Sequence, residues 1–362
     1  TWYYFKGGVL SIDFHPSGLR LATCGSSNEQ SSSGLAVIWY VKPIISENDR
    51  RDQNCPRILY QVPFKSCVSC VRWSTNGQYL ACGGDDKYVM ILEGSYRAED
   101  HIHEESYCER FRLEGHTGDI LHFEWSRDGR YLASCGLDHF VIIWDAHKLP
   151  EKVVLLDASR GGHTAPIKGL SWDPSTRFLA TQAADRSLRI WCVKKWQCVE
   201  VINDPFLESY QTTLFCRMDW SADGDYLLVP CAKSATTGFT VQLIRRNDWD
   251  TSQHLVYHRN SVTAVRACSK SVQYKDYEDN THKATCFAVG SRDKGISIWL
   301  IPDYNRPVRV LDDIFKHSVM DFSWHDYHLL ACSMDGSIRS ILFTEEDIGR
   351  ILLSNNEVLI IC

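Results

Sequence analysis

Tryptophan recurs at two fixed places in a repeated pattern along this chain, and this pattern constrains the fold more than any other feature of the sequence. At the first place, Trp follows an apolar run and precedes a turn, as in Trp73-Ser-Thr-Asn-Gly and Trp125-Ser-Arg-Asp-Gly. At the second place, Trp ends an alternating β-branched run, as in Val141-Ile142-Ile143-Trp144. Five tryptophans at the first place and four at the second account for most of the 12 in the chain. The five are Trp73, Trp125, Trp172, Trp220 and Trp324, with Phe14 at the same place in an earlier unit, and the four are Trp39, Trp144, Trp191 and Trp299.

The second place divides the chain into seven units of similar length. Leu92, Ile244 and Ile341 occupy it where Trp is missing, and successive members lie 53, 52, 47, 53, 55 and 42 residues apart. Self-similarity at such a period is typical of propellers and other repeat architectures. Each unit holds three short runs of period-two alternation separated by turn residues, which predicts antiparallel strands. The Asn-Gly or Asp-Gly pair after the first run of several units suits a tight hairpin.

An aspartate occupies a fixed register in most units. It lies six positions before the residue that ends the third run, at Asp86, Asp138, Asp185, Asp293 and Asp335. Two units also begin with Gly-His, and the combination is the WD-repeat pattern. We therefore predict an all-β fold, a seven-bladed WD-repeat β-propeller. It should form a single domain over residues 1–343, and residues 344–362 should be a C-terminal extension that starts a linker or adds an edge strand.

A ring of blades leaves open edges unless its first and last blades are joined. Trp2-Tyr3-Tyr4-Phe5 precedes the innermost run of the first blade, Val9–Phe14, and is placed to supply the outer strand of blade seven. The tail Glu357–Ile361 is also strand-like and competes for that position. We favour the N-terminal run because sequentially neighbouring runs usually pack together.

Two polar stretches within the units predict loops. Ser26–Gly34 is rich in serine, and Ser269–Lys283 interrupts blade six with Lys, Asp, Glu and Asn. Segments of this composition usually run over the surface, so we expect both to be solvated loops.

Charge and hydropathy exclude several classes of protein. The chain carries 39 Lys+Arg against 45 Asp+Glu, a net charge of −6, which argues against broad, unaided binding to nucleic acid or an anionic membrane. We expect no direct sequence-specific contact with nucleic acid, and no membrane span because no run of 18 apolar residues occurs. Most of the 15 cysteines lie inside apolar strand-like runs, as small buried hydrophobes do in a reducing compartment. We expect an intracellular domain that is monomeric in isolation.

Cys67-Val-Ser-Cys70 has the spacing of a redox or zinc motif. No second such pair and no His pair at zinc-finger spacing accompanies it, and residues three apart in a strand point to opposite faces. Phosphate-binding signatures are absent as well. We expect the two cysteines to pack in the core, with no metal ion and no cofactor.

Two consecutive units place Ser or Thr, His and Asp where blades of this kind bring them into contact. A catalytic triad needs a base oriented by a carboxylate and aimed at an accessible hydroxyl. The alternative is a buried hydrogen-bond chain that braces the blade, and repetition favours it because an active site is seldom duplicated in consecutive repeats. We therefore predict structural tetrads and no enzyme activity. The first tetrad is His116, Ser134, Asp138 and Trp144, and the second is His163, Thr181, Asp185 and Trp191.

The remaining candidate is the end face of the ring around its central channel. Residues beside the first aliphatic of each innermost strand, and those before the turn aspartates, should open onto this face. They mix acidic, basic and apolar side chains, which suits capture of a peptide rather than a metabolite. The predicted partner-binding face consists of Asp85, Asp119, Lys168, Arg292, Met320 and Met334.

Several blocks of sequence go beyond the generic repeat. Gly83-Gly-Asp-Asp-Lys, Ala183-Ala-Asp-Arg-Ser-Leu-Arg-Ile-Trp and Cys332-Ser-Met-Asp-Gly-Ser closely resemble the N-terminal WD-repeat domain of the HIRA histone chaperone family. The resemblance runs from Trp2 to about Asp347, and the chain departs from it at Leu92, where Trp is usual. The related WD subunit of chromatin assembly factor matches the linking segments less well.

Membership of that family would imply a nuclear protein that deposits the replication-independent H3 variant with H4 during nucleosome assembly and so influences transcription. Its WD domain would be a non-enzymatic platform for a ubinuclein-type subunit, and would meet histones and the anti-silencing chaperone through the wider complex. The family's segment for that chaperone and its oligomerisation domain would lie downstream of residue 362. An adaptor propeller of another chromatin or ubiquitin-ligase assembly is the alternative, and a propeller hydrolase would need a solvent-open Ser-His pair.

Overall fold

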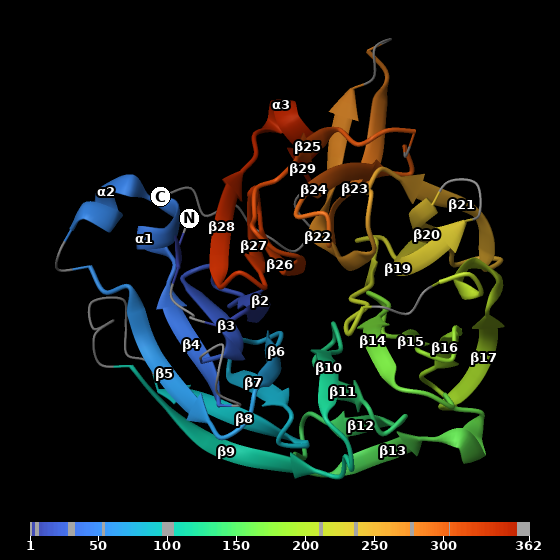
Figure 1. Ribbon diagram of the computed structural model, residues 1–362, viewed down its shortest axis with the longest axis horizontal. Helices are drawn as coiled ribbons and strands as arrows, with labels where there is room; N and C mark the ends of the chain where they lie inside the picture. The colour runs from blue at the N-terminus through green and yellow to red at the C-terminus, as the bar shows by residue number, and fades with distance from the viewer. Residues whose placement is uncertain are drawn as a thin grey trace.

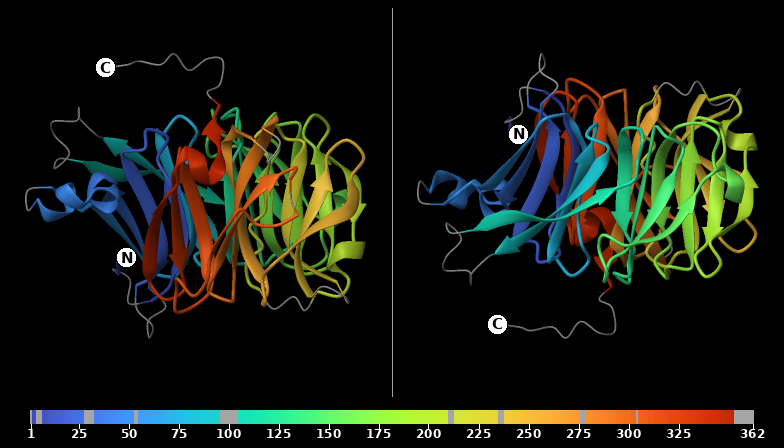
Figure 2. Two further views of the ribbon diagram at one scale, coloured as in Figure 1. Left: turned by 90° about the horizontal axis from the view of Figure 1, so that it is seen from above. Right: turned by 90° about the horizontal axis from the view of Figure 1, so that it is seen from below.

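Seven antiparallel sheets stand around a common axis, and Figure 1 looks down that axis. The computed structural model describes residues 2–3, 7–27, 33–52, 55–95, 105–209, 213–234, 238–275, 279–303 and 305–352. Six of the sheets have four strands and the other has five. Figure 2 shows the blades from the side, with their strands running between the two end faces. The predicted all-β, seven-bladed propeller is confirmed.

The strands of a blade follow one another along the chain, from the innermost strand outward. Within the residues that the structure describes, short helices lie only in connections. These are α1 (Lys42–Ile45) and α2 (Glu47–Arg51) in blade one, 3-10 turns at Ala158–Arg160 and Asp204–Phe206, and α3 (Glu345–Ile348) after the last blade. The strands are, by blade, β2 (Val9–Phe14), β3 (Arg20–Ser26), β4 (Gly34–Tyr40) and β5 (Ile58–Phe64); β6 (Val68–Trp73), β7 (Tyr79–Gly84), β8 (Tyr88–Ser95) and β9 (Ser106–Glu114); β10 (Ile120–Trp125), β11 (Tyr131–Gly136), β12 (Val141–Asp145) and β13 (Lys152–Leu156); β14 (Ile167–Trp172), β15 (Phe178–Ala183), β16 (Leu188–Cys192) and β17 (Gln197–Ile202); β18 (Asp219–Trp220), β19 (Tyr226–Ser234), β20 (Gly238–Arg245) and β21 (Asp250–Val256); β22 (Val262–Lys275), β23 (Thr281–Ser291), β24 (Ile296–Ile301) and β25 (Arg309–Leu311); and β26 (Val319–His325), β27 (His328–Ser333) and β28 (Ser337–Leu342).

The first hairpin of several blades turns at its Asn-Gly or Asp-Gly pair, as predicted. Gly77 and Gly129 have φ of 73° and 72°, a left-handed conformation that costs glycine least. In blade three the Ser126 hydroxyl donates to Asp128 Oδ1 (2.7 Å) and accepts from the Tyr131 N–H (2.9 Å). Ser74, Asp173 and Ser221 accept backbone N–H groups in the same way, so the small polar residue after these tryptophans closes the hairpin by satisfying its backbone.

The N-terminal run closes the ring. β1 (Trp2–Tyr3) pairs antiparallel with β28, with Trp2 opposite Ile338 and Tyr3 opposite Ser337. This confirms the favoured prediction that the N-terminus supplies the outer strand of blade seven. The competing run, Glu357–Ile361, lies outside the described residues.

Blade six contains a hairpin where the sequence predicts a loop. The expectation for Ser269–Lys283 is wrong in its described parts, because β22 continues to Lys275 and β23 already begins at Thr281. The pairing resumes after a register shift between Ala267 and Ser271, and Figure 1 shows the hairpin in orange reaching beyond the ring. β29 (Arg350–Ile351) pairs with β22 there and makes this the five-stranded sheet. Polar and charged side chains, including Lys270, Lys275 and Lys283, concealed these strands in the sequence.

Apolar side chains of neighbouring blades fill the space between the sheets. One such cluster joins Val141 and Ile143 of blade three to Leu170 and Trp172 of blade four. The Trp172 indole also donates to the carbonyl of Glu124 in the preceding blade (2.9 Å). Trp125, Trp220 and Trp324 likewise donate their indole N–H to a carbonyl of the preceding blade, so these residues combine apolar burial with a hydrogen bond across the blade interface. Within the described part of the chain, no helix is both long and apolar enough to cross a membrane.

Candidate functional site

The first predicted tetrad forms a continuous hydrogen-bond chain in blade three. His116 Nδ1 lies 2.8 Å from Asp138 Oδ2, and His116 Nε2 lies 2.8 Å from the Ser134 hydroxyl, which accepts from Trp144 Nε1 (2.9 Å). The carboxylate fixes the proton on Nδ1, so Ser134 donates to Nε2. Ser134 is fully buried, and its hydroxyl already donates to His116 and accepts from Trp144. A hydroxyl in this setting has no path to a substrate.

The charge of the Asp138 carboxylate is stabilised in place. Burial alone raises the pKa of Asp138, but hydrogen bonds from His116 and from the backbone N–H groups of Thr117 and Phe140 outweigh burial and leave the pKa below its ordinary value. The loop that carries His116 is thereby tied to the second and third strands of the blade.

The second tetrad repeats this geometry in blade four. His163 Nδ1 lies 2.9 Å from Asp185 Oδ2, and His163 Nε2 lies 2.8 Å from Thr181 Oγ1, which accepts from Trp191 Nε1 (2.9 Å). Burial lowers the pKa of His163 despite its bond to the carboxylate. The histidine is therefore a neutral element of the brace.

Blade six contains a third set that the sequence analysis missed. His258 joins Asp293 (3.0 Å) to the Ser297 hydroxyl (2.9 Å), which accepts from Trp299 Nε1 (2.8 Å). Here the hydroxyl lies on β24, directly opposite Val289 of β23, rather than on the second strand. A search for Ser or Thr on the second strand therefore passes over it, although the Asp293 and Trp299 spacing marks the blade.

Removing a tetrad member should weaken the fold without removing an activity. We expect His116→Ala or Asp138→Ala to lower the free energy of unfolding by about 1–3 kcal/mol, because the remaining buried partners lose their hydrogen bonds. Urea unfolding measures this, with the exposed His147→Ala in the same blade as control. An unchanged unfolding midpoint, together with labelling of the wild type by a serine-directed probe, would contradict the structural role.

The two acidic residues of the predicted face lie together on one end of the ring. Asp85 follows β7 and donates its N–H to the Cys67 carbonyl (3.1 Å), while the Asp119 carbonyl accepts from the Leu137 N–H (2.8 Å). The second strands end in Gly84 and Gly136, where a Cβ would clash with the carbonyl oxygens of Cys67 and Asp119. These glycines therefore bring the turn after the second strand against the start of the innermost strand in blades two and three.

The negative charges of this face repel one another. Burial raises the pKa of Asp85, and the nearby carboxylates of Asp119 and Asp86 raise it further. Asp85 is nevertheless exposed and Asp119 half-buried. A cationic group arriving here would be attracted by both carboxylates and would relieve their repulsion.

Two residues of the predicted face do not open to solvent. Lys168 and Met320 are only 6% and 8% exposed. The pairing of β14 skips from Ile167 to Gly169, and that of β26 from Val319 to Asp321. The skipped residue of each innermost strand lies in a bulge and points to the axis, so these two side chains belong to the channel wall.

Exposed apolar side chains lie in the turns of several blades at this end of the ring. Leu137 and Met334 are 37% and 51% exposed, and Leu214, which lies just before Phe215 in blade five, is 55% exposed. Arg292 is exposed in the equivalent turn of blade six. Leu214 is absent from the predicted face, although its position before Phe215 marks it. We define the rim as Asp85, Asp119, Leu137, Leu214, Arg292 and Met334.

Below the rim, buried apolar side chains from several blades pack together. Leu10, Leu121, Phe215 and Met320 come from four different blades and belong to one buried apolar cluster. The Arg217 guanidinium lies over the Phe215 ring, 4.6 Å from its centroid. The two ends of the channel are therefore separate surfaces.

The family of this chain follows from a comparison of its whole length with known domains. Residues 2–348 match the model of the CAF1B/HIR1 β-propeller domain. The chain belongs to this family. Within the CAF1B/HIR1 family, a Protein HIRA of Caenorhabditis elegans is 38% identical over 363 residues, covering 98% of this chain and 38% of the relative. Protein HIRA of Homo sapiens is 42% identical over 366 residues, covering 96% and 35%. Protein HIR1 of Cryptococcus neoformans is 34% identical over 351 residues, covering 93% and 38%. The chain thus spans little more than a third of the length of these relatives.

In this member of the CAF1B/HIR1 family, charged side chains fill the channel beneath the apolar cluster. Asp321 Oδ2 accepts from Arg72 Nη1 (2.8 Å) and from the Ser11 hydroxyl (2.8 Å), and lies 3.7 Å from Arg217 Nη1. Arg217 Nη2 donates to the carbonyl of Ser69 (2.9 Å), which joins blade five to blade two across the axis. Contacts between residues so distant in the chain cannot be predicted from local sequence motifs.

In blades one, three and seven, the polar residue just before the last aromatic of the innermost strand braces the next blade. Asp13 Oδ2 accepts from the Trp73 N–H (2.9 Å), and Glu124 Oε2 from the Trp172 N–H (3.2 Å). The Ser323 hydroxyl accepts from the Phe14 N–H (2.9 Å) and joins blade seven to blade one. No cluster of three or more His, Cys, Asp or Glu side chains suited to a metal ion occurs in the described ranges.

Proposed function

We propose that this propeller is a non-enzymatic interaction scaffold of a nuclear histone chaperone complex that deposits the replication-independent H3 variant with H4. In this proposal it binds a ubinuclein-type subunit directly and meets histones and the anti-silencing chaperone through the wider complex. Its membership of the CAF1B/HIR1 family and its relatives named Protein HIRA support the proposal.

The rim is the surface we assign to the partner. The observation that carries this assignment is the pair of adjacent carboxylates, Asp85 and Asp119, beside the exposed Leu137. A partner segment with a basic residue next to an apolar one would find both a charge-assisted contact and an apolar surface here. The ring is held by buried braces and offers a preformed surface, which offsets part of the ordering cost of a flexible segment.

Charge reversal at the rim tests the proposal. We expect Asp85→Lys with Asp119→Lys to weaken binding of a ubinuclein-type fragment at least about tenfold at low salt, with a thermal melt close to that of the wild type. The difference should shrink as salt is added, because screening removes the exposed part of the attraction. Calorimetric titration of the fragment into each variant measures the dissociation constant.

A matched control changes the same amount of charge away from the rim. Glu151→Lys with Glu346→Lys replaces two exposed carboxylates, one in an outer turn of blade three and one in α3. This control should bind the fragment like the wild type. Wild-type affinity of the rim variant would place the partner on the blade sides, and absence of binding by the wild type would refute the partner itself.

A further inference from the structure

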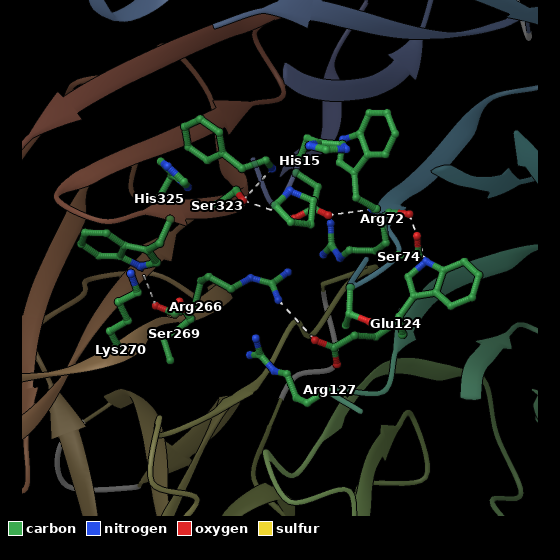
Figure 3. A pocket seen from close by; sticks show the side chains of 18 of the residues that line it. His15, Arg72, Ser74, Glu124, Arg127, Arg266, Ser269, Lys270, Ser323 and His325 are labelled. Carbon is green, nitrogen blue, oxygen red and sulfur yellow. Dashed lines mark hydrogen bonds and ion pairs between the residues drawn. The ribbon is translucent and has the colours of Figure 1, made fainter. Parts of the chain in front are cut away.

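A cavity of about 620 Å³ opens at the end of the channel opposite the rim. It is lined by the turns that follow the innermost strands of blades one, two, three and seven, and by the bulge in β22 (Figure 3). The strand register shows at which end of the channel the cavity lies. Val68, at the rim end of β6, pairs with Gly84, whereas Trp73, at the other end of β6, lines the cavity. Its volume lies within the usual range of about 300–1,000 Å³ for ligand pockets.

Guanidinium groups converge on this cavity with donor capacity to spare. Arg266 lies 3.5 Å from both Glu124 Oε1 and Asp321 Oδ1, whereas a tight charge-assisted hydrogen bond spans about 2.7–2.9 Å. Arg127 has its nearest described carboxylate oxygen on Asp219 at 3.8 Å and makes no hydrogen bond within the described part of the chain. Figure 3 shows the side chains of Arg127 and Arg266 directed toward the same space. Each guanidinium carries five N–H donors in a planar fork that matches a carboxylate.

The mouth of the cavity carries a further cation. Lys270, in the bulge of β22, lies 3.1 Å from Asp326, and the two side chains are 25% and 50% exposed. Arg127 is 37% exposed. Both cations are therefore reachable from solvent.

Hydrogen-bond acceptors and aromatic rings complete the lining. The Asp13 and Glu124 carboxylates face the cavity beside the indoles of Trp125 and Trp324. Burial raises the pKa of Asp13 and of Glu124, and the negative charge of Asp219 raises that of Glu124 further. Removal from water therefore disfavours the charged form of both lining carboxylates.

We propose that this cavity binds an acidic peptide segment, with one of its carboxylate side chains between Arg127 and Arg266. A peptide offers backbone N–H donors for the lining carboxylates together with its own carboxylate for the guanidinium groups. A polyphosphate offers acceptors only, and it brings more negative charge close to Asp13 and Glu124. The indoles supply an apolar wall for the stems of the peptide side chains.

Direct titration tests this second site. A fluorescein-labelled hexaglutamate peptide, followed by fluorescence anisotropy with the whole chain, should bind saturably. Arg127→Ala with Lys270→Ala should weaken that binding at least about tenfold. The thermal melt should stay near that of the wild type, because Arg127 approaches Asp219 only to 3.8 Å and the Lys270–Asp326 pair is partly exposed. The control Arg177→Ala with Lys194→Ala removes two exposed cations of blade four that do not line the cavity, and it should bind like the wild type.

Two results would overturn the proposal. Equal affinity of the wild type and the Arg127 and Lys270 double variant would place the peptide elsewhere. Absence of saturable hexaglutamate binding, with or without binding of inositol hexakisphosphate, would exclude an acidic peptide as the occupant. The inference is independent of the proposed function, since the rim variant tests a different surface with a different partner.

Discussion

An Asp321→Asn variant should unfold at a much lower urea concentration, with its free energy of unfolding reduced by about 3–5 kcal/mol. Asp321 is 1% exposed and takes hydrogen bonds from Arg72, from Ser11 and from the Ile12 N–H. Removing its charge leaves Arg72 and Arg217 buried without their shared carboxylate. Tryptophan fluorescence during urea unfolding reports the loss.

The same carboxylate predicts a pH dependence. Burial raises the pKa of Asp321, but the positive charges of Arg72, Arg217 and Arg266 outweigh burial and hold it far below its ordinary value. A group whose pKa is lowered on folding stabilises the protein above its unfolded pKa, about 4, and loses that contribution as the pH falls further. The stability difference between the wild type and Asp321→Asn should therefore be full at neutral pH and shrink below about pH 4.

An exposed aspartate in the same blade provides the control for Asp321→Asn. Asp326→Asn removes a carboxylate paired with Lys270 at 3.1 Å, and both side chains are partly exposed. Such pairs contribute at most about 1 kcal/mol, so this variant should unfold almost like the wild type. Equal unfolding of Asp321→Asn and the wild type would mean that the channel arginines find other partners when the carboxylate is lost.

Deletion of residues 1–5 should abolish cooperative unfolding or cause aggregation. The deletion removes β1 and leaves the edge of β28 at Ser337 and Ile338 without a partner. An unpaired strand edge is a template for pairing with another chain. Size-exclusion chromatography with light scattering, together with a thermal melt, measures both effects.

A deletion at the other end distinguishes the two ways of closing the ring. Removing residues 353–362 should leave the protein monomeric with the melting behaviour of the full chain. A chain without residues 1–5 that stays monomeric and melts like the parent would instead assign the closing role to the C-terminal tail.

The fold was predictable because the residues that build a blade lie within one repeat. Trp144 and Asp138 are six positions apart, and their partners His116 and Ser134 lie within the same unit. Spacing alone therefore identified two tetrads. The third tetrad was not predicted because its hydroxyl comes from Ser297 on the neighbouring strand. An exchange of the hydroxyl between cross-strand partners does not change the spacing of Asp293 and Trp299.

The channel was not predictable in the same way. Asp321 and Arg72 are 249 positions apart, and their contact depends on the ring being closed. Lys168 and Met320 were expected on an open face, but a bulge turns their side chains to the axis. Period-two alternation gives the direction of a side chain only where the pairing is regular. The cavity could not be predicted either, because its cations come from blades two, three and six and meet only in the closed ring.

The braces between blades also bear on how seven similar units find their order. Stacked repeats with interchangeable contacts are free to assemble with a unit skipped or out of sequence. Here the brace is an aspartate between blades one and two, a glutamate between blades three and four, and a serine between blades seven and one. A blade in the wrong position would bury a carboxylate or an N–H group without its partner. Each of these three interfaces thus has a different polar pair, which favours the native neighbour of each of these blades over another blade.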